Sequence, residues 1–244
     1  MNRMMVLIKG ELVRLNKYHV TTISFVVALI WFLLLYFIDD MDLLAQMLPF
    51  IIIIDATMMS IMFIGAIMFF EKTEQTFSTM LVTPVTHGEL ILSKTIANTI
   101  HSTLSSFLIV LVFHFVKDVD IAWGLIILAL IISITFHSLL GFVFSFHSKD
   151  FTGMLVGVII YFFVFSIPPV LNFFNIIFKG DVWDYLLLIT PTQASIVLVQ
   201  TGFKAPIDIK FFISLAVLIV GGVLGYFYYI KPNFKKYAVK QSGV

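Results

Sequence analysis

Residues 47–70 read MLPFIIIIDATMMSIMFIGAIMFF, and Asp55 is the one ionisable side chain among them. Crossing a hydrocarbon core about 30 Å thick takes about 20 helical residues, so this stretch is long and apolar enough to span a membrane. Comparable stretches recur along the chain, which is 60% hydrophobic and 12% charged. Because a water-soluble fold of 244 residues cannot bury so much apolar surface, we expect the protein to lie in lipid.

The apolar stretches predict six transmembrane helices, at residues 20–38, 47–70, 95–116, 122–146, 153–174 and 209–230. Six crossings take about 120 residues and leave room only for short connections. The predicted fold is therefore an all-α membrane protein in which residues 1–244 form a single transmembrane domain.

Positive charge collects on one side of this predicted bundle. Most of the 15 Lys and Arg residues fall on the side that holds both termini and the segment 71–94. By the positive-inside rule, that side is predicted to be cytoplasmic. The basic residues form no cluster typical of nucleic-acid binding, and the absence of cysteine excludes disulfides and thiolate metal sites.

Residues 1–19 are expected to form an amphipathic helix that lies in the membrane interface. Met5, Ile8, Leu12 and Leu15 recur at helical spacing, and the basic residues between them can face lipid phosphates. The alternative is a disordered basic tail.

Residues 175–208, on the predicted outer side, precede the last span. They are too long for a tight turn and too interrupted, by Gly180 and Pro191, for another pair of spans. We expect short re-entrant helices that dip partway into the outer leaflet, with an ordinary exposed loop as the alternative. Pro168 and Pro169 should break the fifth span and let the chain turn toward this region.

Residues 71–94 read EKTEQTFSTMLVTPVTHGELILSK and form the one polar segment of any length between the spans. Residues 76–82 can make about two helical turns, which Pro84 should end. Phe77, Met80 and Leu81 then share one face and could fill a groove on a cytoplasmic partner. Packing on the bundle or among lipid headgroups is the equal alternative.

This segment resembles that of the permease subunits of ABC-2 type ATP-binding cassette exporters. The family pattern has an acidic start, Gly-Thr-Leu, a Leu-Leu pair, Thr-Pro-Val or similar, a further acid, and an apolar triplet before Gly-Lys. The chain matches it at Glu71, Thr76, Phe77, Met80, Leu81, Thr83, Pro84, Val85, Glu89, Leu90, Ile91, Leu92 and Lys94. It departs at Gln75 and Ser93, where glycine is usual. More loosely, the N-terminal helix with Glu11, the six spans and the re-entrant helices also resemble this family.

The resemblance implies an export permease of the bacterial plasma membrane, paired with a second, identical or homologous permease above two copies of a separate ATPase subunit. Segment 71–94 would contain the coupling helix that the ATPase grips. The residues expected to serve this coupling are Glu71, Glu74, Thr76, Phe77, Met80, Leu81 and Pro84. ATP-Mg would bind the partner ATPase, and this chain would bind lipid but no cofactor, metal or nucleic acid.

Residues 88–95, GELILSKT, differ from a phosphate-binding loop only in Ser93, which would have to be glycine. That loop needs flexible backbone with exposed N–H groups, whereas residues 90–92 are apolar and lead into a span. We therefore expect the chain not to be an enzyme and to have no catalytic residues. Because its spans carry almost no fixed charge, we expect an amphipathic or hydrophobic substrate, such as a drug, a lipid or a membrane-active peptide.

Asp55, His101 and His137 are candidate substrate or gating residues inside the predicted spans. A charge at the membrane centre costs about 2.5–3.5 kcal/mol, so Asp55 should face protein or water, and it could equally be a packing residue. The two histidines are expected at similar depth, where they could share a polar contact or a water. An ion-coupled secondary transporter that uses Asp55 is the alternative function, and an anchor or immunity protein that acts by binding is a third.

Overall fold

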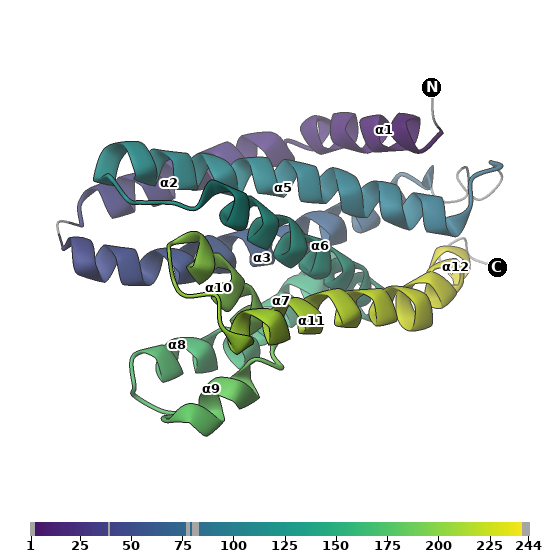
Figure 1. Cartoon of the computed structure of the whole chain (residues 1–244). Helices are drawn as coiled ribbons and strands as arrows, with labels where there is room; N and C mark the ends of the chain where they lie inside the picture. Colours follow the sequence, from purple (N-terminus) through teal and green to yellow (C-terminus); the bar gives the residue numbers. More distant parts are fainter. Residues whose placement is uncertain (1–2, 39, 77–78, 80–82, 241–244) are drawn as a thin grey trace.

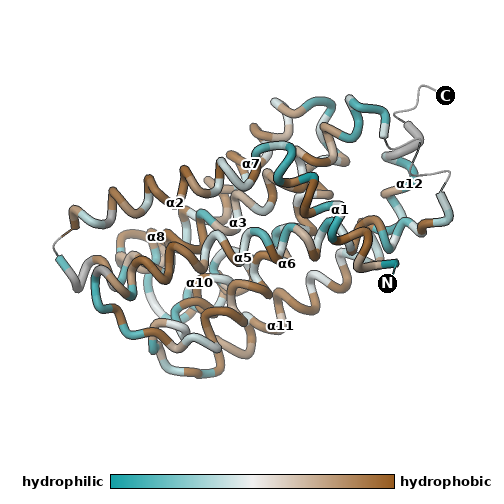
Figure 2. The backbone as a smooth tube through the Cα atoms, turned by 90° about the horizontal axis from the view of Figure 1, so that it is seen from above, coloured by the Kyte–Doolittle hydropathy of each residue, from teal (hydrophilic) through white to brown (hydrophobic). Residues whose placement is uncertain are grey.

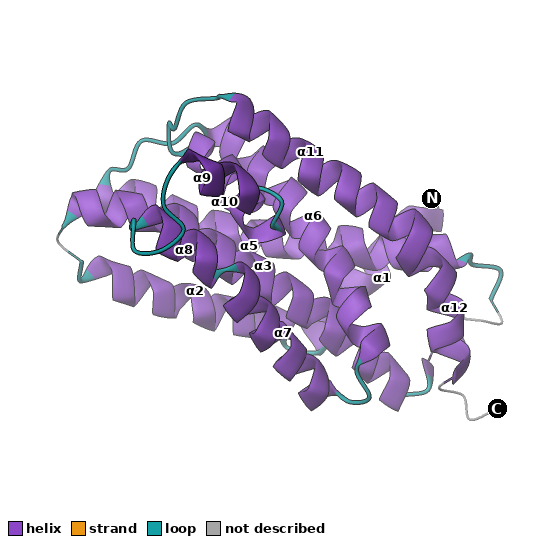
Figure 3. Cartoon of the chain, turned by 90° about the horizontal axis from the view of Figure 1, so that it is seen from below, coloured by secondary structure: helices purple, strands orange, loops and turns teal. Residues whose placement is uncertain are grey.

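The computed structural model of the chain describes residues 3–38, 40–76, 79 and 83–240. These residues form helices, and no strand occurs among them (Figure 3). The helices in chain order are α1 (Arg3–Lys17), α2 (Val20–Tyr36), α3 (Met41–Thr73), α5 (His87–Lys117), α6 (Trp123–His147), α7 (Phe151–Phe165), α8 (Ile167–Phe173), α9 (Asp181–Leu187), α10 (Pro191–Gly202), α11 (Ile209–Leu224), the π-helix η1 (Gly225–Ile230) and α12 (Lys231–Lys240). The all-helical class predicted from the sequence is confirmed for this part of the chain.

Five helical stretches are long and apolar enough to cross a membrane, namely Gln46–Thr73, His87–Phe115, Trp123–His147, Phe151–Phe173 and Ile209–Tyr237. Two bent pairs add up to two more: α1 with α2, bent by 63°, and α9 with α10, bent by 105°. The described residues therefore hold five to seven candidate spans, a range that includes the predicted six. The first predicted span corresponds to α2, which has 17 residues and reaches span length only together with α1.

The spans form one bundle. Hydrophilic residues gather mainly at its two ends, and hydrophobic residues occupy the length between them (Figure 2). α1, α12, the end of α3 and the start of α5 share one end of the bundle (Figure 1). Which face of the membrane this end occupies stays a prediction.

α3 lies at the centre of the bundle and packs against α5, α6, α7 and α10. Its buried side chains Ile52 and Ile53 join Ile126 and Leu130 of α6 and Val199 of α10 in the largest hydrophobic core. The helix that precedes the last span is therefore part of the core. Burial of α10 argues against the exposed loop that was the alternative for residues 175–208.

The fifth predicted span is interrupted at Ser166, between α7 and α8. Pro168 and Pro169 stand in the first turn of α8, where backbone N–H groups make no hydrogen bonds within the helix. Proline is therefore tolerated there, and the break lies just before the two prolines. Both pieces still form one span, Phe151–Phe173, and the chain turns only after it. The predicted break is therefore present, but the turn comes later than expected.

Gly141 of α6 lets α6 approach α3 closely. A Cβ atom at this position would lie 2.9 Å from the backbone oxygen of Ile61 and 2.7 Å from Cβ of Ile64. Neither atom belongs to the far end of a flexible side chain, so the helices would have to move apart.

We predict that Gly141→Ala lowers the free energy of unfolding by about 1–3 kcal/mol, the usual cost of overpacking, despite the better helix propensity of alanine. Gly124→Ala, on the same helix but with no atom within 4 Å of the new Cβ, is the matched control. Thermal unfolding of the two purified variants in detergent measures the difference. Equal melting temperatures would contradict the close α3–α6 contact.

Candidate functional site

Four ionisable side chains meet where α1, α3 and α5 converge, and we call them the charge cluster. Glu11 and Arg14 come from α1, Glu71 from the last turn of α3 and Lys94 from the first half of α5. Glu71 and Glu11 are thus brought together from distant parts of the sequence. Both carboxylates contact the same two cations.

Each cation of the charge cluster contacts both carboxylates. Nζ of Lys94 donates to Oε1 of Glu11 at 2.9 Å and also to Oε1 of Glu71. Nη1 of Arg14 donates to Oε1 and Oε2 of Glu11, at 3.0 and 3.1 Å, and also to Glu71. With two acids and two bases, the formal charges of the cluster cancel.

The charge cluster is largely shielded from solvent. The side chains of Glu71 and Lys94 are 0% exposed and that of Glu11 is 7% exposed, whereas that of Arg14 is 25% exposed. Burial opposes the charge on Arg14, but the carboxylates of Glu11 and Glu71 outweigh it and raise the pKa of the guanidinium above its usual value. Such a cluster is stable only while complete, because removing one member leaves an uncompensated buried charge.

Further contacts join α1 to the chain that leaves α3. Glu74 accepts a hydrogen bond from the Tyr18 hydroxyl at 2.8 Å and lies 3.9 Å from Nζ of Lys17. Burial and this hydrogen bond raise the pKa of Tyr18 to about 12, so the hydroxyl keeps its proton and donates. The Thr76 hydroxyl donates to the backbone oxygen of Glu71 at 3.2 Å.

At the other end of the connection, Thr86 and Glu89 begin α5 with a capping box. The Thr86 side chain accepts a hydrogen bond from the backbone N–H of Glu89. The Glu89 side chain in turn accepts one from the backbone N–H of Thr86. Arg3 of α1 lies 3.4 Å from the Glu89 carboxylate. α1 therefore contacts both ends of the chain between α3 and α5.

The predicted coupling residues fall into two groups. Glu71, Glu74 and Thr76 take part in the contacts just described, and Pro84 is exposed. The remaining ones lie outside the described residues: Phe77, Met80 and Leu81. Arg14 and its pairing were not predicted. Glu11 and Lys94 were noticed only through the family resemblance, although a lysine between apolar residues at a span's start is itself a signal that it needs an acidic partner.

Asp55 lies in a narrow cleft between α2, α3 and α5. Its Oδ1 accepts a hydrogen bond from Nε1 of Trp31 at 3.0 Å. Ser24 of α2 and Ser102, Ser105 and Ser106 of α5 line the same cleft, whose volume of about 10 Å³ suits one water-sized group. The prediction that Asp55 faces protein or water agrees with this position, whereas the contact with Trp31 was not foreseen.

The two histidines do not share the predicted contact. His137 is fully buried, with Nδ1 2.8 Å from the Ser133 backbone oxygen and Nε2 2.9 Å from the Tyr161 hydroxyl. His101 packs its ring edge against Phe63, and its Nδ1 has no hydrogen-bond partner among the described residues. The prediction was wrong because Tyr161, from the next helix, occupies the position that His101 was expected to fill. Within the described residues, no group of three or more His, Cys, Asp or Glu side chains could hold a metal ion.

We predict that Glu71→Gln lowers the free energy of unfolding by about 3–5 kcal/mol, because the fully buried Lys94 then has one carboxylate for a partner. Glu74→Gln, three residues later and 40% exposed, should cost less than about 1 kcal/mol. Adding Lys94→Met to Glu71→Gln should cost less than the sum of the single changes. Thermal unfolding in detergent measures the wild type, the three single variants, including Lys94→Met, and the double variant. Additive effects of Glu71→Gln and Lys94→Met would show that the two charges are not coupled.

The chain matches no family model. It is 23% identical over 201 residues to two curated proteins named as fluoroquinolones export permease proteins, from two strains of Mycobacterium tuberculosis. The alignment covers 80% of this chain and 80% of each relative. The chain is a distant homologue of these export permeases, and its resemblance to ABC-2 type permeases is confirmed.

Proposed function

We propose that this chain is the membrane subunit of an ATP-driven exporter that moves drugs or similar amphipathic molecules out of a bacterial cell. The observation that carries the proposal is the similarity to export permeases over 80% of the chain. The long apolar helices support it, because they provide a path through lipid with very few fixed charges.

The ATPase would be a separate subunit, present in two copies beneath two permeases that are identical or homologous. Residues 88–95, which resemble a phosphate-binding loop, lie inside α5, so their backbone follows a helix. Lys94, which would have to reach phosphate, is held in the charge cluster. Both observations favour hydrolysis of ATP-Mg by a partner.

Residues 1–244 would form one transmembrane domain with six spans. α1 would lie in the membrane interface, α9 and α10 would be re-entrant on the outer side, and segment 71–94 would be cytoplasmic together with both termini. The 63° bend between α1 and α2 supports the first of these placements, and the 105° bend between α9 and α10 supports the second.

The charge cluster suggests how a push by the ATPase reaches the bundle. Segment 71–94 begins at Glu71, at the end of α3, and ends at Lys94 in α5, and these two side chains contact each other. Through Arg14 and Glu11, the same contacts include α1, which packs along α5. A force on the coupling helix would therefore move α1, α3 and α5 together.

An ion-coupled secondary transporter is the second candidate, and Asp55 in its serine-lined cleft is the observation that favours it. The two functions differ in their energy source. Proteoliposomes that contain this chain alone, under a proton or sodium gradient, should accumulate no substrate if the exporter proposal holds. Gradient-driven uptake without any ATPase would establish the second function instead.

We predict that Phe77→Asp, Met80→Asp and Leu81→Asp together abolish the stimulation of the partner ATPase, because charge would replace the apolar face that the ATPase grips. Membrane insertion should be unchanged. Thr79→Asp, on the opposite side of the helix by its spacing and exposed, is the control and should keep stimulation within about twofold. ATPase activity of the reconstituted complex measures the effect, and full stimulation by the triple variant would remove the coupling assignment.

A further inference from the structure

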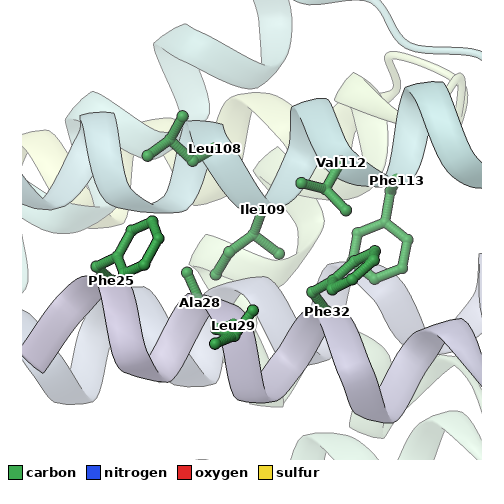
Figure 4. Close-up of a pocket in the computed structure, with 8 residues that line it drawn as sticks. All are labelled: Phe25, Ala28, Leu29, Phe32, Leu108, Ile109, Val112 and Phe113. Atoms are coloured by element: carbon green, nitrogen blue, oxygen red, sulfur yellow. The ribbon is translucent and has the colours of Figure 1, made fainter.

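Two cavities adjoin each other along the seam between α2 and α5. One is the cleft at Asp55, and the other is an apolar groove of about 230 Å³. Figure 4 shows the aromatic rings of Phe25, Phe32 and Phe113 along the groove, with Leu29 and Ile109 between them. The groove is therefore shaped by rings and aliphatic side chains, whereas the cleft combines serines and a carboxylate with apolar side chains.

The two cavities adjoin at Ile109, which lines both of them. On α2 the cleft is lined by Ser24 and Val27, and the groove by Phe25 and Ala28, each one residue further along. One residue corresponds to about 100° around a helix, so the two stripes lie on neighbouring faces. The polar cleft and the apolar groove therefore lie side by side along α2.

The carboxylate in the cleft has no cationic partner. Among the residues that line the cleft, Asp55 is the one ionisable side chain, and no Lys, Arg or His is present. Glu71, by contrast, contacts Lys94 and Arg14. The negative charge of Asp55 is balanced only by the indole N–H of Trp31, so the cleft is complementary to a cation.

A second polar group in the cleft also lacks a partner. Ser102 is 2% exposed, and its hydroxyl makes no hydrogen bond to any described residue. A buried hydroxyl without a partner is costly, so its presence in the same cleft as a carboxylate favours a ligand that can hydrogen-bond to both groups. A protonated amine donates to hydroxyl and carboxylate oxygens alike, and an ammonium group is about the size of the water that the cleft can hold.

We propose that the cleft and the groove together form a binding site for an amphipathic amine. Its ammonium group binds Asp55 and Ser102, and its apolar body lies against Phe25, Phe32 and Phe113. The inference rests on the proposed export function and narrows its substrate class to cationic amphiphiles. The site lies between α2 and α5, within the apolar part of the bundle.

Two fluorescent probes test this site. Dansylcadaverine has a naphthalene body and a primary ammonium group, and its N-acetyl derivative has the same body without the charge. The full-length chain in lipid nanodiscs, without ATPase, is titrated with each probe while dansyl emission is recorded. We expect the wild-type protein to bind the amine more tightly than the acetylated probe.

The variants separate charge from shape. Asp55→Asn keeps an acceptor for Trp31 and should weaken the affinity for the amine about tenfold. Its affinity for the acetylated probe should stay within about twofold of the wild type. Ser102→Ala should weaken amine binding less, by about threefold, and Phe32→Ala should weaken both probes. Asp120→Asn, which removes an exposed acid far from the cleft, should change neither.

Equal affinity of the wild-type protein for both probes would overturn the proposal. An equal loss of both probes in Asp55→Asn, with a normal size-exclusion profile, would overturn it too, because Asp55 would then only shape the cleft. ATP-dependent transport by the assembled complex is a separate measurement. ATP-dependent transport without a preference for amines would support the export function and exclude the amine site. Amine binding without ATP-dependent transport would support the amine site and exclude the export function.

Discussion

Charges below the surface of a membrane are stable only when opposite charges accompany them, and this constraint governs the end of the bundle where α1, α3 and α5 meet. Lys94 and Arg14 each contact both Glu11 and Glu71, so a shift of α3 alone would separate Glu71 from both cations, and a shift of α5 alone would separate Lys94 from both carboxylates. The connection between α3 and α5 is thereby anchored at its base. In the proposed function, the charge cluster would hold the base of this connection in place while an ATPase pushes on it.

The same constraint has a different outcome deeper in the bundle. Asp55 accepts a hydrogen bond from the indole of Trp31 and shares its cleft with serines, but no cation among the described residues lines that cleft. Glu71 is satisfied by the protein itself and serves to hold helices together. In the proposed binding site, the ammonium group of a ligand would balance the charge of Asp55. Two acids in one helix, α3, are thus assigned opposite tasks by what the neighbouring helices place beside them.

Much of the architecture could be predicted because span length depends only on a local sum of hydrophobicity. The fourth predicted span, 122–146, differs from α6 by one residue at each end. α5 begins earlier than expected, since Thr86 and Glu89 cap it outside the apolar stretch. The contacts between helices could not be predicted, because helices that are apolar all round do not reveal which face meets which neighbour. The rotation of each helix about its axis decides three contacts that were not predicted: Arg14 with Glu71, Trp31 with Asp55, and His137 with Tyr161.

The electrical neutrality of the charge cluster has a consequence for energy conversion. Each unpaired elementary charge that crosses the membrane field exchanges about 2.3 kcal/mol with every 100 mV of potential. Two acids and two bases that travel as a unit exchange almost nothing. If the charge cluster couples the bundle to an ATPase, as we propose, that coupling would be insensitive to the membrane potential and would continue in a depolarised cell as long as ATP is present.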